Sequence, residues 1–167
     1  ALIEFFTSIL KKKWKTLFYL SFSHIFCHNN NEGPFPPESA LQFLFTKLKS
    51  LNSSSCQSLK GLSFSGNFIN DDFFDFLKKC SNIKSLYLDY CLSQDSPFID
   101  TFCDMIENSL PNLNVLSIKG DVIQNRVIGE YFPTLCKSLK RCKCLQCLIV
   151  SDNMIGLKGL QALSKLF

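Results

Sequence analysis

One short apolar pattern occurs five times in this chain of 167 residues. It reads Leu/Ile-x-x-Leu-x-Φ, in which Φ is Leu, Ile, Phe or Val. The five copies are Leu17, Leu20 and Phe22; Leu59, Leu62 and Phe64; Ile83, Leu86 and Leu88; Leu113, Leu116 and Ile118; and Leu145, Leu148 and Val150. A turn and an amphipathic helical segment follow each copy, and one such unit cannot bury its own apolar face. The repetition therefore predicts an α/β fold in which successive strand–helix units stack on one another.

End signals place several of the intervening helices. Asn70 is predicted as the N-cap of the second helix, because acidic residues follow it and lysines occupy the last turn, as the helix dipole favours. Ser96 and Pro97 are predicted as the N-cap and first residue of the third helix, which should end near Ser109. Pro133 indicates that the fourth helix either starts there or is kinked.

Helical spacing of apolar residues predicts which side chains face the core. Residues 1–11 are interpreted as the helix of a truncated preceding repeat, residues 28–37 as a surface loop rich in Asn and Pro, and residues 38–51 as a helix. The predicted core positions are Leu41, Leu44, Leu48 and Leu51; Phe73, Phe76 and Leu77; Ile99, Phe102, Cys103, Ile106 and Leu110; and Leu135, Cys136 and Leu139.

The repeats resemble the ribonuclease-inhibitor-like class of leucine-rich repeats. The fifth copy, Leu145-x-x-Leu148-x-Val150-x-x-Asn153-x-Ile155-x-x-x-Gly159-x-x-x-Leu163, is similar to the variant with Asn and Gly. The third, Cys80-x-x-Ile83-x-x-Leu86-x-Leu88-x-x-Cys91-Leu92, is similar to the variant with Cys at the asparagine position. The spacing between copies is irregular, and the first copy has neither Asn nor Cys at the third position after Phe22.

The resemblance implies a leucine-rich-repeat solenoid, here a horseshoe fragment with parallel strands on the concave face and helices on the convex face. We expect residues 1–167 to form a single domain of about five repeats, cut from a longer chain. The class includes inhibitors, nucleotide-sensing receptor domains, GTPase-activating proteins and F-box adaptors, so the resemblance specifies a fold more than a function.

Of the nine cysteines, Cys56, Cys80, Cys103, Cys136 and Cys142 are interpreted as packing residues. Cys56, Cys80 and Cys142 each lie three residues before a copy of the pattern, where Trp14 and Leu110 stand in the other two repeats. A position shared by Cys, Trp and Leu is an apolar packing position, in which a thiol acts as a small hydrophobe. The run Cys136, Cys142, Cys144, Cys147 and the group His24, Cys27, His28 are therefore not expected to bind metal.

Alternation along each strand predicts a shared exposed surface. If the pattern leucines point inward, the residues between them point outward and line the concave face. The partner-binding candidates on this face are Tyr19, Ser63, Ser85, Tyr87, Asp89, Ser117, Lys119 and Ile149. Tyrosine combines a large contact area with a polar tip, so Tyr87 is the expected anchor. Tyr90 and Asp121 could extend the patch along one rim.

Several function classes lack support in the sequence. The chain has no paired carboxylates, nucleophile motif or phosphate-binding loop, so we expect no enzyme, cofactor or metal. The net charge of +4 is modest and its lysine clusters lack interleaved aromatic residues, so no nucleic-acid binding is expected. No run of 18 apolar residues occurs, so no membrane span is expected. The basic and apolar stretch 11–27 fits the repeat register better than a secretory signal.

The sequence thus predicts a non-catalytic protein-interaction module of an intracellular, cytoplasmic or nuclear protein, because buried reduced cysteines are typical of that environment. Its oligomeric state is left open. Two alternatives remain: a sensor or autoinhibitory repeat domain of a nucleotide-binding receptor, and the substrate-recognition domain of an F-box type ubiquitin ligase adaptor. An additional P-loop domain would favour the first alternative, and an F-box the second.

Overall fold

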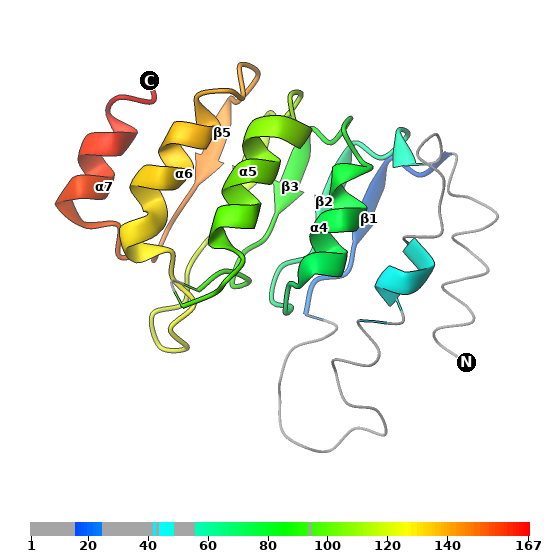
Figure 1. Ribbon diagram of the computed structural model, residues 1–167, viewed down its shortest axis with the longest axis horizontal. Coiled ribbons are helices and arrows are strands. Elements are labelled where there is room, and N and C mark those ends of the chain that lie inside the picture. The colour runs from blue at the N-terminus through cyan, green and yellow to red at the C-terminus, as the bar shows by residue number, and fades with distance from the viewer. Residues whose placement is uncertain (1–15, 25–41, 43, 49–55, 94) are drawn as a thin grey trace.

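The computed structural model describes residues 16–24, 42, 44–48, 56–93 and 95–167. Strands and helices alternate along these residues, which confirms the predicted α/β class (Figure 1). The elements in chain order are β1 (Tyr19–Ser21), β2 (Gly61–Ser63), α4 (Asp71–Lys78), β3 (Ser85–Tyr87), α5 (Ile99–Ser109), β4 (Val115–Ser117), the 3₁₀ helix η2 (Gly129–Tyr131), α6 (Phe132–Leu139), β5 (Cys147–Ile149) and α7 (Gly156–Leu163). Residues 44–48, from the predicted helix 38–51, are also helical.

The strands form one parallel sheet in the order β1-β2-β3-β4-β5. The central leucines of the five pattern copies are directly paired across it, in the order Leu20, Leu62, Leu86, Leu116 and Leu148. The predicted register of the repeats is therefore confirmed. Backbone hydrogen bonds continue past the strands, for example from Tyr90 N to Lys119 O at 2.8 Å.

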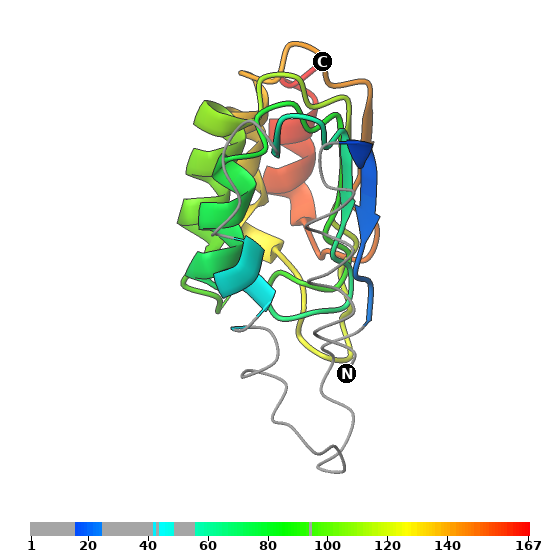
Figure 2. The same ribbon diagram turned by 90° about the vertical axis from the view of Figure 1, so that its right-hand side faces the viewer.

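The helices lie on one side of this sheet. Figure 2 shows α4, α5, α6 and α7 to the left of the strands, and each packs on the next along the row. No helix of the described residues covers the opposite side, which we call the open face. In the described part of the chain, no helix is both long and apolar enough to cross a membrane.

The core lies between the sheet and the helix row. Leu62, Leu86 and Leu116 are fully buried, whereas Leu20 and Leu148 on the two end strands are partly buried. The inward positions predicted on α4, α5 and α6 are all buried. On the first helical segment Leu48 is buried and Leu44 is partly buried, while Leu41 and Leu51 lie outside the described residues.

Phenylalanine fills much of the core around β2 and α4. The Phe45 ring lies 5.4 Å from that of Phe64 and 5.7 Å from that of Phe73, and the Phe64 and Phe73 rings stack at 4.9 Å. Such pairs add to the stabilisation from burial of the rings. The sequence analysis placed Phe73 inward but missed Phe45 and Phe74, which are also buried.

Two of the three predicted helix starts are confirmed. Asn70 caps α4, since its Oδ1 accepts a hydrogen bond from Phe73 N at 3.0 Å, and α6 starts with Pro133 in its first turn. The prediction for α5 was wrong by two residues at its start. Ser96 Oγ accepts from Phe98 N at 3.3 Å within a turn, and the helix begins only at Ile99; its end at Ser109 is as predicted.

Buried side chains tie neighbouring repeats together at their turns. Asn153 Nδ2 donates to Ile118 O of the preceding repeat at 2.6 Å and to two carbonyls of its own turn. Asn67 Nδ2 donates to Phe22 O in the same way, at 2.6 Å. At the equivalent position the thiol of Cys91 contacts Phe64 O at 3.3 Å. The asparagine contacts give hydrogen-bond donors to the carbonyls of Phe22 and Ile118 in the preceding repeats.

The cysteines divide into buried and exposed groups. Cys56, Cys80 and Cys142 are buried at the predicted packing position, Cys103 and Cys136 are buried on their helices, and no disulfide joins the described cysteines. Burial raises the pKa of the thiols of Cys103 and Cys142 to about 11. A hydrogen bond with Cys56 and burial both raise the pKa of Cys80.

These thiols should make the fold sensitive to alkali. Their folded pKa values lie above the ordinary thiol pKa of 9.0, so above pH 9 the unfolded chain releases protons that the folded chain keeps. The free energy of unfolding should therefore fall as pH rises from 9 to 11, by up to about 1.4 kcal/mol per thiol and pH unit. Urea titrations at pH 8 to 10.5 measure this slope.

Two variants distinguish the contribution of these thiols to the slope from that of other groups that titrate in alkali. Replacing Cys103 and Cys142 together with alanine should flatten the slope, whereas Cys144→Ala, at an exposed thiol, should leave it unchanged. An equal slope in both variants would show that the buried thiols do not carry the effect.

Candidate functional site

The open face consists of three rows of side chains that run across the sheet. The first row crosses the strand starts and the second crosses the strand ends, as the pairing of the strands defines them. The third row follows the strands, where backbone hydrogen bonds continue the ladder. The rows are Tyr19, Gly61, Ser85, Val115 and Cys147; Ser21, Ser63, Tyr87, Ser117 and Ile149; and Ser23, Ser65, Asp89, Lys119 and Ser151.

Tyr19 presents an aromatic ring at one end of the first row. It is 51% exposed, and the ring lies across Gly61 on the neighbouring strand. A Cβ atom on Gly61 would clash with Tyr19 Cδ2, so any larger residue there would displace the ring. Gly61 thus seats an exposed aromatic group on the open face.

Tyr87 stands at the centre of the second row between two serines. It pairs with Ser63 on one side and Ser117 on the other, and its side chain is half-buried. The expectation that Ser63 and Ser117 are exposed was wrong, since they are only 7% and 1% exposed. The larger side chain of Tyr87 shields the two short serine side chains from solvent. Both hydroxyls are also hydrogen-bonded, that of Ser63 with Ser23 Oγ at 2.6 Å and that of Ser117 with Asp89 Oδ1 at 2.5 Å.

Asp89 has a structural task on this face. Its Oδ1 accepts hydrogen bonds from Ser117 Oγ and from Lys119 N, and its own backbone N–H donates to Ser65 Oγ at 3.1 Å. The carboxylate therefore joins β3 to β4 beside Tyr87. Sequence reasoning grouped Asp89 with contact residues and missed this role, because the hydrogen bonds connect repeats that are distant in sequence.

The other candidates lie around this centre. Ser85, Lys119 and Ile149 are half-buried on the open face, so the structure brings them together with Tyr87. Of the two predicted rim residues, Asp121 forms hydrogen bonds within its own turn, where its Oδ1 accepts from Ile123 N and Gln124 N. Tyr90 adopts a left-handed backbone with φ of 62° and its ring lies 6.3 Å from that of His24.

Within the described ranges, no group of three or more His, Cys, Asp or Glu side chains could hold a metal ion. Of the cysteine run, Cys136 and Cys142 are buried, while Cys144 and Cys147 are exposed. His24 is exposed, and Cys27 and His28 lie outside the described residues. The open face presents the rings of Tyr19 and Tyr87, the apolar side chains of Val115 and Ile149, the Cys147 thiol and the Lys119 amine among small polar groups.

Comparison with known proteins gives a likeness of fold. No family model matches the chain, and no curated protein matches its sequence. Among solved structures, the tropomodulin C-terminal domain of Caenorhabditis elegans superposes with a TM-score of 0.61 at 8% identity. The match covers 99% of this chain and 91% of that one. At this identity the likeness concerns the fold, a leucine-rich-repeat-like arrangement of parallel strands and helices.

Proposed function

We propose that this chain is a non-catalytic protein-interaction module that binds a partner protein on the open face. The observation that carries the proposal is the exposed aromatic surface on a side of the sheet that no described helix covers. Tyr19 and Tyr87 supply large, stiff contact areas, and Ile149 adds an apolar group. Large aromatic side chains carry much of the binding free energy at protein interfaces.

Neighbouring residues hold the two tyrosines of this face in position. Gly61 seats the Tyr19 ring, and Asp89 joins the strands beside Tyr87. Side chains held in one geometry lose less conformational entropy when a partner binds, so affinity increases. Serines around the two tyrosines leave room for a partner to approach.

A finer architectural proposal accompanies this function. We infer that the repeats belong to the ribonuclease-inhibitor-like class and form a solenoid whose concave surface is the open face. The hydrogen bonds of Asn67, Cys91 and Asn153 to the preceding repeat support the proposal, because each stands at the same position of its repeat. We further propose an intracellular location, supported by exposed Cys144 and Cys147 thiols that form no disulfide.

The test is substitution of the anchor on the full-length chain. Tyr87→Ala should lower the amount of partner recovered by affinity capture by at least about tenfold, which corresponds to a loss of about 1.4 kcal/mol. Asp89 is left intact because it supports the sheet. Tyr131→Ala is the matched control, since Tyr131 is an exposed tyrosine on η2. Unchanged recovery with Tyr87→Ala, or equal loss with Tyr131→Ala, would refute the site.

A further inference from the structure

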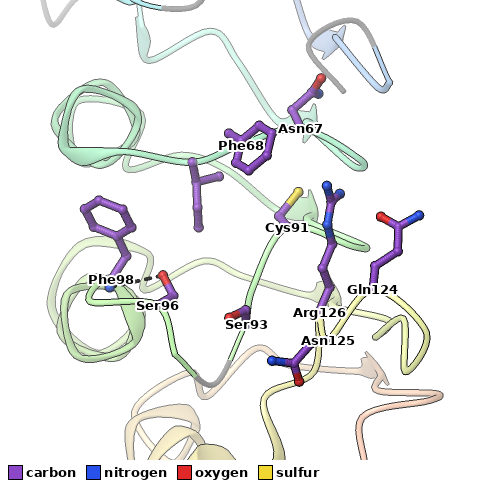
Figure 3. Close-up of a pocket in the computed structure, with 10 residues that line it drawn as sticks. Asn67, Phe68, Cys91, Ser93, Ser96, Phe98, Gln124, Asn125 and Arg126 are labelled. Atoms are coloured by element: carbon purple, nitrogen blue, oxygen red, sulfur yellow. Dashed lines mark hydrogen bonds between the residues drawn. The ribbon is translucent and has the colours of Figure 1, made fainter. Parts of the chain in front are cut away.

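A separate cleft of about 410 Å³ lies past the strand ends. Three loops from successive repeats enclose it, following β2, β3 and β4, and Figure 3 shows their side chains around a common space. Phe68, Ile69 and Phe98 supply apolar walls, and Phe68 is 41% exposed. The polar lining includes Ser93, Ser96, Gln124 and Arg126.

Arg126 is held in place inside this cleft. Its backbone N–H donates to Asp121 O, and its O accepts from Asp121 N, both at 2.8 Å. Its Nη1 donates to Tyr90 O at 2.9 Å, and its guanidinium lies 5.3 Å from the centre of the Phe68 ring. No carboxylate of the described residues forms an ion pair with it. A guanidinium has five N–H donors, so several remain for a ligand.

The other polar groups of the cleft also have hydrogens to donate. Ser93 Oγ accepts from Asp95 N at 3.2 Å and Ser96 Oγ accepts from Phe98 N at 3.3 Å, which leaves the hydroxyl hydrogens for a ligand. The exposed side-chain amide of Gln124 forms no hydrogen bond with the described residues. A cleft rich in donors fits a ligand that is rich in acceptors.

The charges around the cleft favour a carboxylate over a phosphate. Asp95 lies at the rim, where its Oδ2 accepts from Asn125 Nδ2 at 2.9 Å, so a negative charge already stands close to the site. One guanidinium can balance one carboxylate in the two-bond geometry that this pair prefers. A phosphate group carries about −1.5 to −2 charges at pH 7 and would be repelled more strongly by Asp95.

We propose that this cleft binds an acidic side chain, Glu or Asp, that neighbours an apolar residue in a peptide segment of a partner protein. The carboxylate pairs with Arg126 and accepts from neighbouring donors of the cleft, the Gln124 amide among them, and the apolar neighbour packs on Phe68 and Phe98. This site is distinct from the open face and does not depend on the function proposed for it.

The site can be tested by titrating short peptides into the ¹⁵N-labelled full chain and monitoring the binding by NMR. The probe acetyl-Leu-Glu-amide should shift the backbone signals of Phe68, Ile69 and Arg126 and bind at least about fivefold more tightly than acetyl-Leu-Gln-amide. Two further probes address other sources of anionic charge: acetyl-Gly-Leu with a free terminal carboxylate, and inorganic phosphate. Equal affinity for the Glu and Gln probes, or tighter binding of either alternative probe, would overturn the proposal.

Variants of the two arginines in the chain give a matched pair. Arg126→Met keeps an unbranched apolar stem and should reduce the affinity for acetyl-Leu-Glu-amide to that for the Gln probe. Arg141→Met removes an exposed arginine that pairs with Glu107 at 3.3 Å, and it should change nothing at the cleft. Because Arg126 also donates a hydrogen bond to Tyr90 O, its replacement could disturb the loop, and a second variant is needed. Gln124→Leu should lower the affinity for acetyl-Leu-Glu-amide at least about twofold. Binding that survives both cleft variants would contradict the assignment.

Discussion

Replacing Leu86 with aspartate is expected to unfold the chain. Leu86 is fully buried at the middle of the sheet and is paired with Leu62 and Leu116. Loss of a buried leucine side chain costs about 2–5 kcal/mol, and burial of an unpaired carboxylate adds several kcal/mol. A domain is typically stable by only about 5–15 kcal/mol. Circular dichroism of Leu86→Asp should therefore show no cooperative thermal transition.

Ser85→Asp is the control for that prediction. Ser85 is the adjacent residue on β3, and its side chain lies half-buried on the open face, where a carboxylate can reach water. This variant should lose less than about 1 kcal/mol. Equal damage from both substitutions, or a native-like melting curve for Leu86→Asp, would contradict the alternation of side chains across the sheet.

Replacing Asn153 with leucine is expected to lower the free energy of unfolding by about 3 kcal/mol, through the turn that follows β5. The side chain has 3% exposure, and its Nδ2 donates to carbonyls of Ile118, Val150 and Ser151. Its Oδ1 also accepts from Ile128 N at 3.1 Å. Leucine has a similar size but removes these hydrogen bonds from Ile118 O, Val150 O and Ile128 N, while Ser151 O keeps its bond from Gly120 N. Urea unfolding would measure the difference.

Asn108→Leu provides the comparison, because Asn108 is exposed on α5 and its Nδ2 contacts only Asp104 Oδ1 among the described residues. Its effect should stay within about 0.5 kcal/mol. If Asn153→Leu were as mild as Asn108→Leu, the asparagine hydrogen bonds would not hold adjacent repeats together.

The pattern of leucines sufficed to predict the strand register. In a parallel sheet with one buried face, every second residue of each strand must face the core, so a shift by one residue would expose the leucines. The central leucines pair as expected, and the buried packing position of Cys56, Cys80 and Cys142 followed from the same register. Local propensity was less decisive at α5, where a turn built on Ser96 delays the helix to Ile99.

Exposure on the open face was harder to predict than register. Alternation correctly assigned Ser63 and Ser117 to that face, but burial there depends on the height of neighbouring side chains, which Tyr87 supplies from an adjacent strand. Asn67 carried a usable signal that was overlooked, since it stands three residues after Phe64 just as Asn153 stands three after Val150. The cleft around Arg126 had no local signal, because loops of three repeats build it.

The most direct test of the account is site-specific photo-crosslinking of the full-length chain in its cell of origin. A benzophenone amino acid placed at Tyr87 or Ile149 samples the open face, and the same group at Asp104 samples the exposed side of α5. If the open face binds the partner, adducts with one common partner should form from both open-face positions, and none with that partner should form from Asp104. Adducts that form from Asp104 but not from Tyr87 would contradict it.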